Sequence, residues 1–296
     1  MHEFKALIGG LSFTECPRWR DGRLCVSDFY THRVLAVAMD GAAETVAHVP
    51  GQPSGLGFLP DGRMLIVSMR DRKILRREFD GSLSEHADLS GLAPWHLNDM
   101  LVDGEGRAWV GNFGFDLMGG VKACTTVLIS VEPDGSARVA AGGLGFPNGM
   151  ALTPDGQTLI VAESTMNRLS AFSLASGSLG ERRTWAAFGD PPTATHVHEM
   201  LAEVAVAPDG ICLDAEGAVW VADAAHHRLI RVAEGGSILD ELKIDEAGVF
   251  ACMLGGEDGC TLFACVAPTF EEAEASAHHR ASILTTKVRV PHAGLP

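Results

Sequence analysis

The sequence predicts an all-β protein, a six-bladed β-propeller with a metal site in its central channel. Three observations predict it: a hairpin motif recurs six times, the recurrences are spaced as propeller blades are, and one position of the repeat carries oxygen-bearing side chains. The chain has 296 residues, 46% of them hydrophobic, which is enough to bury a sizeable core. We expect residues 1–296 to form a single propeller domain.

The recurring motif is an Asp-Gly or Glu-Gly pair between two apolar stretches. Glycine tolerates the positive φ of tight turns, so the pattern is a strong local signal for a β-hairpin. The six segments are RDGRLCVSD (20–28), PDGRMLIVSM (60–69), GEGRAWVGN (104–112), PDGQTLIVAE (154–163), AEGAVWVAD (215–223) and EDGCTLFACV (257–266). Their turn glycines are Gly22, Gly62, Gly106, Gly156, Gly217 and Gly259. Spacings of 40, 44, 50, 61 and 42 residues are typical of four-stranded blades.

Two longer connections are expected beside the hairpins. The 61-residue spacing contains residues 190–208, which we interpret as an insertion leading into the fifth blade. Long loops in compact domains are often functional, so this insertion is a candidate lid over the channel mouth. The strongest helical candidate, residues 270–280, is polar, and we expect it to lie in a loop.

A second motif follows the first in three of the segments. It consists of an acidic residue, three further residues, His or Asn, and then Arg: DFYTHR (28–33), ESTMNR (163–168) and DAAHHR (223–228). Side chains in such turns commonly form local hydrogen bonds and ion pairs. Because the motif recurs, we interpret its acids and histidines as scaffold rather than as catalytic groups.

One position of the repeat, seven or eight residues before each turn glycine, lies where the innermost strand of each blade is expected to begin. Its occupants are Glu15, Ser54, Asn98, Asn148, Asp209 and Ala251. Four of these six side chains offer carboxylate or amide oxygens and together carry two negative charges, which one divalent cation balances. Burying two carboxylates without a cation is costly. We therefore predict one divalent metal (Ca, Mn, Zn or Mg) held by Glu15, Asn98, Asn148 and Asp209.

A competing interpretation is that Asn148-Gly149 and Asp209-Gly210 are simple turn pairs. It does not account for Glu15 and Asn98, which no glycine follows. The recurrence of the position therefore favours a metal site.

Four longer motifs carry a resemblance to a known family. They are ECPRW (15–19), HLNDMLVDGEGRAWVGN (96–112), FPNGMALTPDGQTLIVAE (146–163) and APDGICLDAEGAVWVAD (207–223). With them, nearly the whole chain resembles the senescence-marker/gluconolactonase-like family of regucalcin, gluconolactonases and related bacterial lactonases. More distantly it is similar to paraoxonases and to the diisopropyl-fluorophosphatase type. The resemblance implies a six-bladed propeller with one divalent metal in the channel, bound by Glu15, Asn148 and Asp209.

The resemblance also implies roles for neighbouring residues. Asn98 either completes the metal shell or holds a water and the substrate, Asp209 is the general base, and Asp116 contacts the substrate. Relatives of the gluconolactonase type commonly have Arg two residues before the Asn, where this chain has His96. Lactone chemistry therefore carries over more firmly than sugar specificity.

Together with the predicted metal site, the resemblance implies a metal-dependent hydrolase that opens a lactone. We assign catalysis to Asp209, Asn98 and His96, with His96 close enough in sequence to donate a proton to the leaving alkoxide, and substrate binding to His96, Asn98 and Asp116. The sequence has no Gly-x-Ser-x-Gly motif that would indicate a serine hydrolase. Pocket walls are expected from Trp95, Phe113, Phe115 and Met118.

Two other functions compete with this one. The first is hydrolysis of aryl esters or organophosphates on the same scaffold, which would use the same metal ligands. The second is a non-catalytic, metal-stabilised propeller that binds a partner. The oxygen ligands gathered at one position of the repeat argue against the second, because a binding propeller does not need them.

Composition restricts partners and location. The net charge of −15 disfavours nucleic acid and anionic membranes as partners. The partner that the family resemblance implies is a small-molecule lactone or ester. No stretch of 18 apolar residues and no signal-peptide pattern is present. The seven cysteines include no CxxC pair and are interpreted as reduced thiols, so we expect a cytoplasmic protein.

Overall fold

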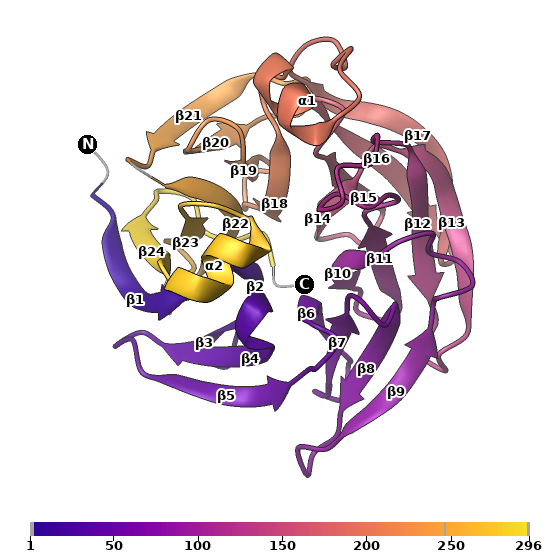
Figure 1. Cartoon of the computed structure of the whole chain (residues 1–296), viewed down its shortest axis with the longest axis vertical. Coiled ribbons are helices and arrows are strands. Elements are labelled where there is room, and N and C mark those ends of the chain that lie inside the picture. Colours follow the sequence, from indigo (N-terminus) through magenta and orange to yellow (C-terminus); the bar gives the residue numbers. More distant parts are fainter. Residues whose placement is uncertain (1–2, 246, 295–296) are drawn as a thin grey trace.

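The computed structural model describes residues 3–245 and 247–294. Six antiparallel four-stranded sheets surround a central channel, which confirms the six-bladed propeller (Figure 1). In each blade the first strand in the order below lies innermost.

Blades 1 to 3 follow one another along the chain. Blade 1 contains β2 (Thr14–Arg20), β3 (Arg23–Asp28), β4 (Arg33–Ala38) and β5 (Ala43–His48). Blade 2 contains β6 (Pro53–Phe58), β7 (Met64–Ser68), β8 (Lys73–Arg77) and β9 (Leu83–Asp88). Blade 3 contains β10 (Leu97–Val102), β11 (Ala108–Asn112), β12 (Thr126–Val131) and β13 (Ala137–Leu144).

Blades 4 to 6 complete the ring. Blade 4 contains β14 (Pro147–Leu152), β15 (Thr158–Glu163), β16 (Arg168–Ala175) and β17 (Ser178–Ala187). Blade 5 contains β18 (Pro208–Leu213), β19 (Val219–Asp223), β20 (Arg228–Val232) and β21 (Ile238–Lys243). Blade 6 contains β22 (Gly248–Gly255), β23 (Thr261–Ala267), β24 (Ala281–Lys287) and, outermost, β1 (Lys5–Leu11). Since β1 pairs with β24, strands from both ends of the chain close the ring.

The two sequence repeats occupy the turns predicted for them. The six turn glycines all lie between the first and second strands of their blades, with φ between 69° and 94°. The second motif joins the second and third strands, and the residue before its Arg is left-handed: His32, Asn167 and His227 have φ of 57°, 55° and 51°. Because Asn and His adopt this conformation more readily than most residues, the alternation of His and Asn is explained.

The acids of the second motif are buried and paired with its arginines, which confirms their scaffold role. Arg33 contacts Asp28 at 3.2 Å, Arg168 contacts Glu163 at 2.9 Å and Arg228 contacts Asp223 at 2.8 Å.

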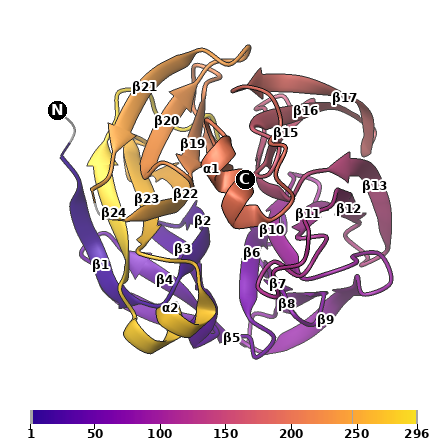
Figure 2. The same ribbon diagram turned by 45° about the horizontal axis from the view of Figure 1, so that its top comes forward.

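Short helices interrupt three of the connections. A 3₁₀ turn, η1 (Phe29–Thr31), follows β3, and α1 (Val197–Glu203) lies in the 190–208 insertion between β17 and β18. Residues 270–280, expected as a loop, instead contain α2 (Glu272–His278), with acidic residues in its first turn, where they favour a helix, and Ala275 buried. Figure 2 shows α1 and α2 projecting from the same face of the propeller.

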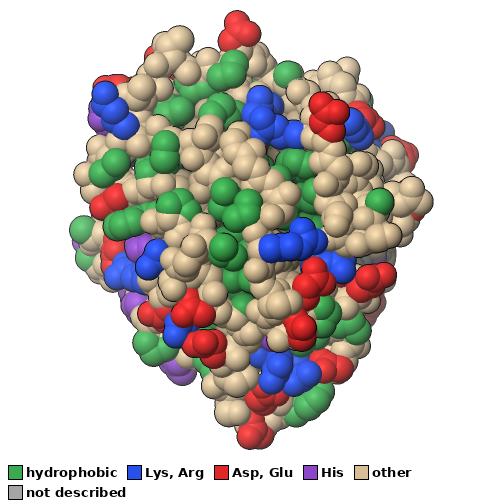
Figure 3. All heavy atoms as spheres, turned by 90° about the vertical axis from the view of Figure 1, so that its right-hand side faces the viewer, with side chains coloured by type: hydrophobic (Ala, Val, Ile, Leu, Met, Phe, Trp, Pro, Cys, Tyr) green, Lys and Arg blue, Asp and Glu red, His purple; other side chains and the backbone are tan. Residues whose placement is uncertain are grey.

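The surface charges, the cysteines and the helix lengths can be compared with the expectations from composition. Figure 3, which views the outer side of blades 3 and 4, shows acidic and basic side chains side by side. All seven cysteines are free, and five of them are buried. No helix in the described part of the chain is long and apolar enough to cross a membrane.

Candidate metal and substrate site

The four predicted metal ligands lie at one end of the channel. Glu15, Asn98, Asn148 and Asp209 are the second residues of β2, β10, β14 and β18, and each is only 6% to 8% exposed. In every one of these strands the pairing register shifts at the ligand, and such bulges re-aim side chains. All four line one cavity of about 330 Å³, whereas Ser54 and Ala251 are not among the residues that line it.

Glycines after the ligands bring the innermost strands together. Gly149 and Gly210 lie inside strands rather than in turns, so the turn-pair interpretation is wrong. A Cβ on Gly149 would lie 2.6 Å from the carbonyl oxygen of Asp209, and one on Gly210 would lie 2.6 Å from the Cα of Ala251. Only glycine therefore lets adjacent blades approach closely enough to place these ligands around one cavity.

Gly149→Ala is expected to lower the free energy of unfolding by about 1–3 kcal/mol, because the added methyl forces the strands apart. It should also reduce the rise in melting temperature on adding a divalent metal, since Asn148 and Asp209 are displaced. Gly142→Ala is the matched control, because a Cβ there meets nothing within 4 Å. Urea denaturation of both variants, with chelator and with metal, makes the comparison. Equal stabilities would show that the close approach is not needed.

The acids of the second motif position the ligand strands. Asp28 accepts a hydrogen bond from the backbone N–H of Ser12 at 2.9 Å. Glu163 accepts a hydrogen bond from the backbone N–H of Gly145 at 2.8 Å, and Asp223 accepts one from the backbone N–H of Ala207 at 3.0 Å. Each bonded N–H lies two or three residues before a ligand, so the scaffold acids anchor the chain as it enters the innermost strand.

The electrostatics of the cavity floor fit a divalent cation. Burial, followed by the charges of Asp209 and Asp99, raises the pKa of Glu15. Burial and Asp99 likewise raise the pKa of Asp209, although the Asn148 side chain opposes the shift. Asp209 Oδ1 and Asn98 Nδ2 have no hydrogen-bond partner in the described part of the chain. Crowded carboxylates and an unpartnered acceptor are what a bound cation would compensate.

The donor set is a mixed one. Within residues 3–245 and 247–294, no group of three or more His, Cys, Asp or Glu side chains is arranged to hold a metal. The floor combines two carboxylates with two amides instead, which is the oxygen-only set predicted from the repeat.

His96 and Asp116, the other predicted substrate contacts, also line the cavity. The ring of Trp95 stacks on His96 with 5.0 Å between centroids. Burial, assisted by the charge of Arg70, lowers the pKa of His96. Asp116 Oδ1 accepts a hydrogen bond from the Gly119 N–H at 2.8 Å, and a Cβ on Gly119 would lie 2.3 Å from Asp116 Oδ2, so both carboxylate oxygens lie beside Gly119.

The predicted walls are mostly correct. Trp95, Phe113 and Met118 line the cavity. Phe115 does not: it is buried against Phe146, with ring centroids 6.2 Å apart, so its assignment to the wall was wrong.

The 190–208 insertion reaches the cavity, as a lid would. Its helix α1 supplies Val197 and Leu201 to the wall. His198 of α1 contacts Glu271 at 3.3 Å and stacks on Phe270 at 5.6 Å, which ties the insertion to the connection that carries α2. Closure of this segment stays a prediction.

A buried ion pair below the ligands was missed by the sequence analysis. Arg18 Nη2 lies 3.1 Å from Asp99 Oδ1, with both side chains 5% exposed, and Arg18 also donates to the carbonyl oxygen of Met100. A signal was present: Asp99 occupies the position that is glycine in blades 2, 4 and 5. At this position the innermost strands of neighbouring blades lie close together, so a carboxylate there is buried and needs a positively charged partner.

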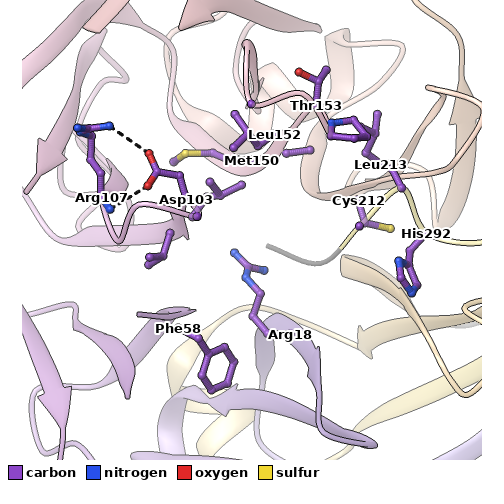
Figure 4. A pocket seen from close by; sticks show the side chains of 18 of the residues that line it. Arg18, Phe58, Asp103, Arg107, Met150, Leu152, Thr153, Cys212, Leu213 and His292 are labelled. Atoms are coloured by element: carbon purple, nitrogen blue, oxygen red, sulfur yellow. Dashed lines mark hydrogen bonds and ion pairs between the residues drawn. The ribbon is translucent and has the colours of Figure 1, made fainter. Parts of the chain in front are cut away.

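A larger cavity of about 830 Å³ lies at the opposite end of the channel, where the innermost strands end. Figure 4 shows Arg18 pointing into it, and Asp103 paired with Arg107 at 3.2 Å on its wall. None of the predicted site residues lines this cavity. Since Arg18 faces it and Asp99 follows Asn98, their ion pair lies between the two cavities.

Comparison with known proteins agrees with the motifs. A family model described as the SMP-30/Gluconolactonase/LRE-like region matches residues 13–267. The chain belongs to this family. The family match confirms the resemblance carried by the four longer motifs.

Members of the SMP-30/gluconolactonase-like family and a solved structure show the range of similarity. The chain is 27% identical to a 6-deoxy-6-sulfogluconolactonase of Pseudomonas putida over 95% of its length and 93% of the relative's. It is 25% identical to pentonolactonase XacC of Haloferax volcanii over 76% and 72% of the two chains. A regucalcin from Agrobacterium tumefaciens, described as a calcium-binding protein, shares the fold with a TM-score of 0.76, 19% identity and coverage of 98% and 97%.

Proposed function

We propose that this protein is a metal-dependent lactonase, which hydrolyses a cyclic ester to a hydroxy acid. The observation that carries the proposal is the convergence of four oxygen donors, from four blades, on the floor of a single small-molecule cavity. The names of the lactonase relatives from Pseudomonas putida and Haloferax volcanii support the same reaction class.

Glu15, Asn98, Asn148 and Asp209 would hold the cation, and their oxygen atoms suit Ca, Mg or Mn, with Zn also possible. A divalent cation held there would act as a Lewis acid toward the lactone carbonyl. Asn98, which lines the cavity, would also orient the substrate.

The protein's own groups move the protons. Asp209, whose Oδ1 is unpartnered, accepts a proton from the water whose oxygen bonds to the carbonyl carbon. The ring carbon–oxygen bond then breaks, and the proton taken by Asp209 is the one that the ring oxygen gains. His96, which lines the wall, would donate a hydrogen bond to that oxygen as it leaves, and Asp116, on the same wall, would bind a polar substituent.

Lactone hydrolysis is expected to disappear with a chelator and to return when Ca, Mn, Zn or Mg is added back. A pH-indicator assay over a panel of lactones, aryl esters and phosphotriesters measures this, and the rise in melting temperature reports metal binding separately. Saturating metal at about a hundredfold excess over Kd should stabilise the protein by about 2.7 kcal/mol.

The same panel separates the competing functions. Turnover of aryl esters or phosphotriesters without lactone hydrolysis would replace the lactonase proposal with the hydrolase alternative. Metal-induced stabilisation with no turnover of any substrate would favour a binding propeller.

A further inference from the structure

We infer that the substrate is a lactone bearing an alkyl or aryl substituent, rather than a lactone with hydroxyl groups on most ring carbons. The inference rests on the proposed lactonase activity and concerns the walls of the same cavity. It follows from the aromatic side chains that form the walls of the cavity and from the polar side chains at its rim that are bonded to one another.

One wall is an aromatic cluster from blades 1 and 6. The rings of Phe13 and Phe250 have centroids 4.8 Å apart, and Phe250 and Phe270 are 6.3 Å apart. Phe13 precedes β2, Phe250 lies in β22, and Phe270 precedes α2. These three rings all line the cavity, so this wall offers a ligand apolar surface.

A second aromatic cluster comes from blades 3 and 4. Phe113 and Phe146 meet edge to face with centroids 4.7 Å apart, and Trp95 and Met118 extend the same wall. Because β2 and β22 lie across the channel from β10 and β14 (Figure 1), the two clusters flank the floor from opposite sides. A ligand with its carbonyl on the floor therefore has aromatic surface on both sides.

Several polar groups at the rim are already bound to one another. The Tyr30 hydroxyl donates to the carbonyl oxygen of Phe270 at 2.6 Å. Arg70 donates to Gln52 at 2.7 Å and to Glu272 at 2.6 Å. Arg70, the only Arg or Lys among the described residues that line the cavity, thus has its charge balanced by Glu272 at the exposed rim, and its guanidinium keeps further N–H donors there.

Outside this rim network, few side chains above the floor carry polar atoms. They are His96, Ser164, Thr165, Asp116 and the indole N–H of Trp95, and Ser164 is already bonded to Asn148 and to the carbonyl oxygen of Pro208. A lactone with a hydroxyl on most ring carbons would bury several of them against aromatic rings without partners, and each unpaired hydroxyl lowers affinity. An alkyl or aryl substituent meets no such penalty.

The backbone conformation of Phe146 is a further feature of this aromatic wall. Phe146 has φ of 53°, a left-handed conformation that is strained for a bulky aromatic residue. Residues held in such conformations tend to cluster at ligand sites. Here the conformation turns the chain just before β14, where the Phe146 ring lines the cavity and Asn148 reaches the floor.

A series of γ-lactones with lengthening alkyl chains tests the inference. The metal-supplemented protein should show kcat/KM rising by about threefold for each added methylene until the walls are filled. D-Glucono-1,5-lactone should be hydrolysed with kcat/KM at least about 100-fold below the best alkyl lactone. A higher kcat/KM for gluconolactone would overturn the inference.

A binding measurement separates this inference from the proposed activity. γ-Lactams with the same chains cannot be hydrolysed as readily, and their binding can be followed by tryptophan fluorescence with chelator or with metal. Affinity that rises with chain length supports the apolar ligand class, and affinity that is flat or falls overturns it. Absence of lactone turnover alone would instead count against the lactonase proposal.

Substitutions in the wall provide a second test. Phe146→Asn should lower the ratio of kcat/KM for γ-decalactone over γ-butyrolactone by about tenfold, because a polar side chain replaces aromatic surface. Asn tolerates the left-handed conformation, so the backbone turn is kept. Met118→Asn, at a side chain already 47% exposed, should lower the same ratio by about threefold without risk to folding.

Phe79→Asn is the matched control, because Phe79 is 77% exposed and lies outside the cavity. It should leave the ratio unchanged. An unchanged ratio in both wall variants would overturn the inference.

Discussion

Asp209→Asn is expected to lower kcat/KM for lactone hydrolysis by at least about 10³-fold while the protein stays folded. The substitution removes a charged donor from the floor and the group proposed to take the proton from water. The metal-free variant should be at least as stable as the wild type, because a buried carboxylate near Glu15 and Asp99 is replaced by a neutral group of the same shape. Kinetics and thermal melts, with chelator and with metal, measure both effects.

The matched control is Asp214→Asn, which removes another buried carboxylate just after the same strand, β18. Asp214 is fully buried and pairs with Arg231 at 2.6 Å, away from the cavity floor. This variant should lose stability yet keep its activity and its metal-induced rise in melting temperature. Activity of Asp209→Asn within tenfold of the wild type would remove Asp209 from the site.

The blade count was predictable from sequence because its signal is local. Each first hairpin needs a residue with positive φ at a fixed point, and an acidic residue followed by Gly marks that point six times. The closure of the ring was not predictable, because β1 pairs with β24 about 280 residues later, and an apolar strand does not specify its partner. Helix α2 was missed because a polar helix of two turns carries little periodicity.

The floor of the site was predictable for a similar reason. Its four donors occupy equivalent positions of one repeat, so symmetry brings them together. The walls lack that symmetry, since Tyr30, Arg70 and Phe270 come from connections between second and third strands that differ from blade to blade. The misassigned Phe115 shows the consequence: in such a loop, sequence position does not determine which way a side chain points.

Arg18→Met is expected to lower the free energy of unfolding by about 3–5 kcal/mol, measured by urea denaturation with chelator present. The change leaves Asp99 buried and unpaired, because Arg18 is its ion-pair partner at 3.1 Å. The double variant Arg18→Met/Asp99→Asn should recover much of the loss, since it removes the uncompensated charge. The control is Arg23→Met, which breaks an exposed pair with Glu44 at 2.8 Å and should cost less than about 1 kcal/mol.

The charges around the floor predict how metal changes this result. When all three are ionised, as cation binding favours, Glu15, Asp99 and Asp209 carry three negative charges within interacting distance, and Arg18 contributes one positive charge. Two negative charges remain, which is what one divalent cation balances. Without Arg18, the cation has one more charge to compensate, so saturating metal should stabilise Arg18→Met more than it stabilises the wild type. An equal or smaller metal-induced rise in melting temperature would mean that Arg18 is not part of the charge balance of the site.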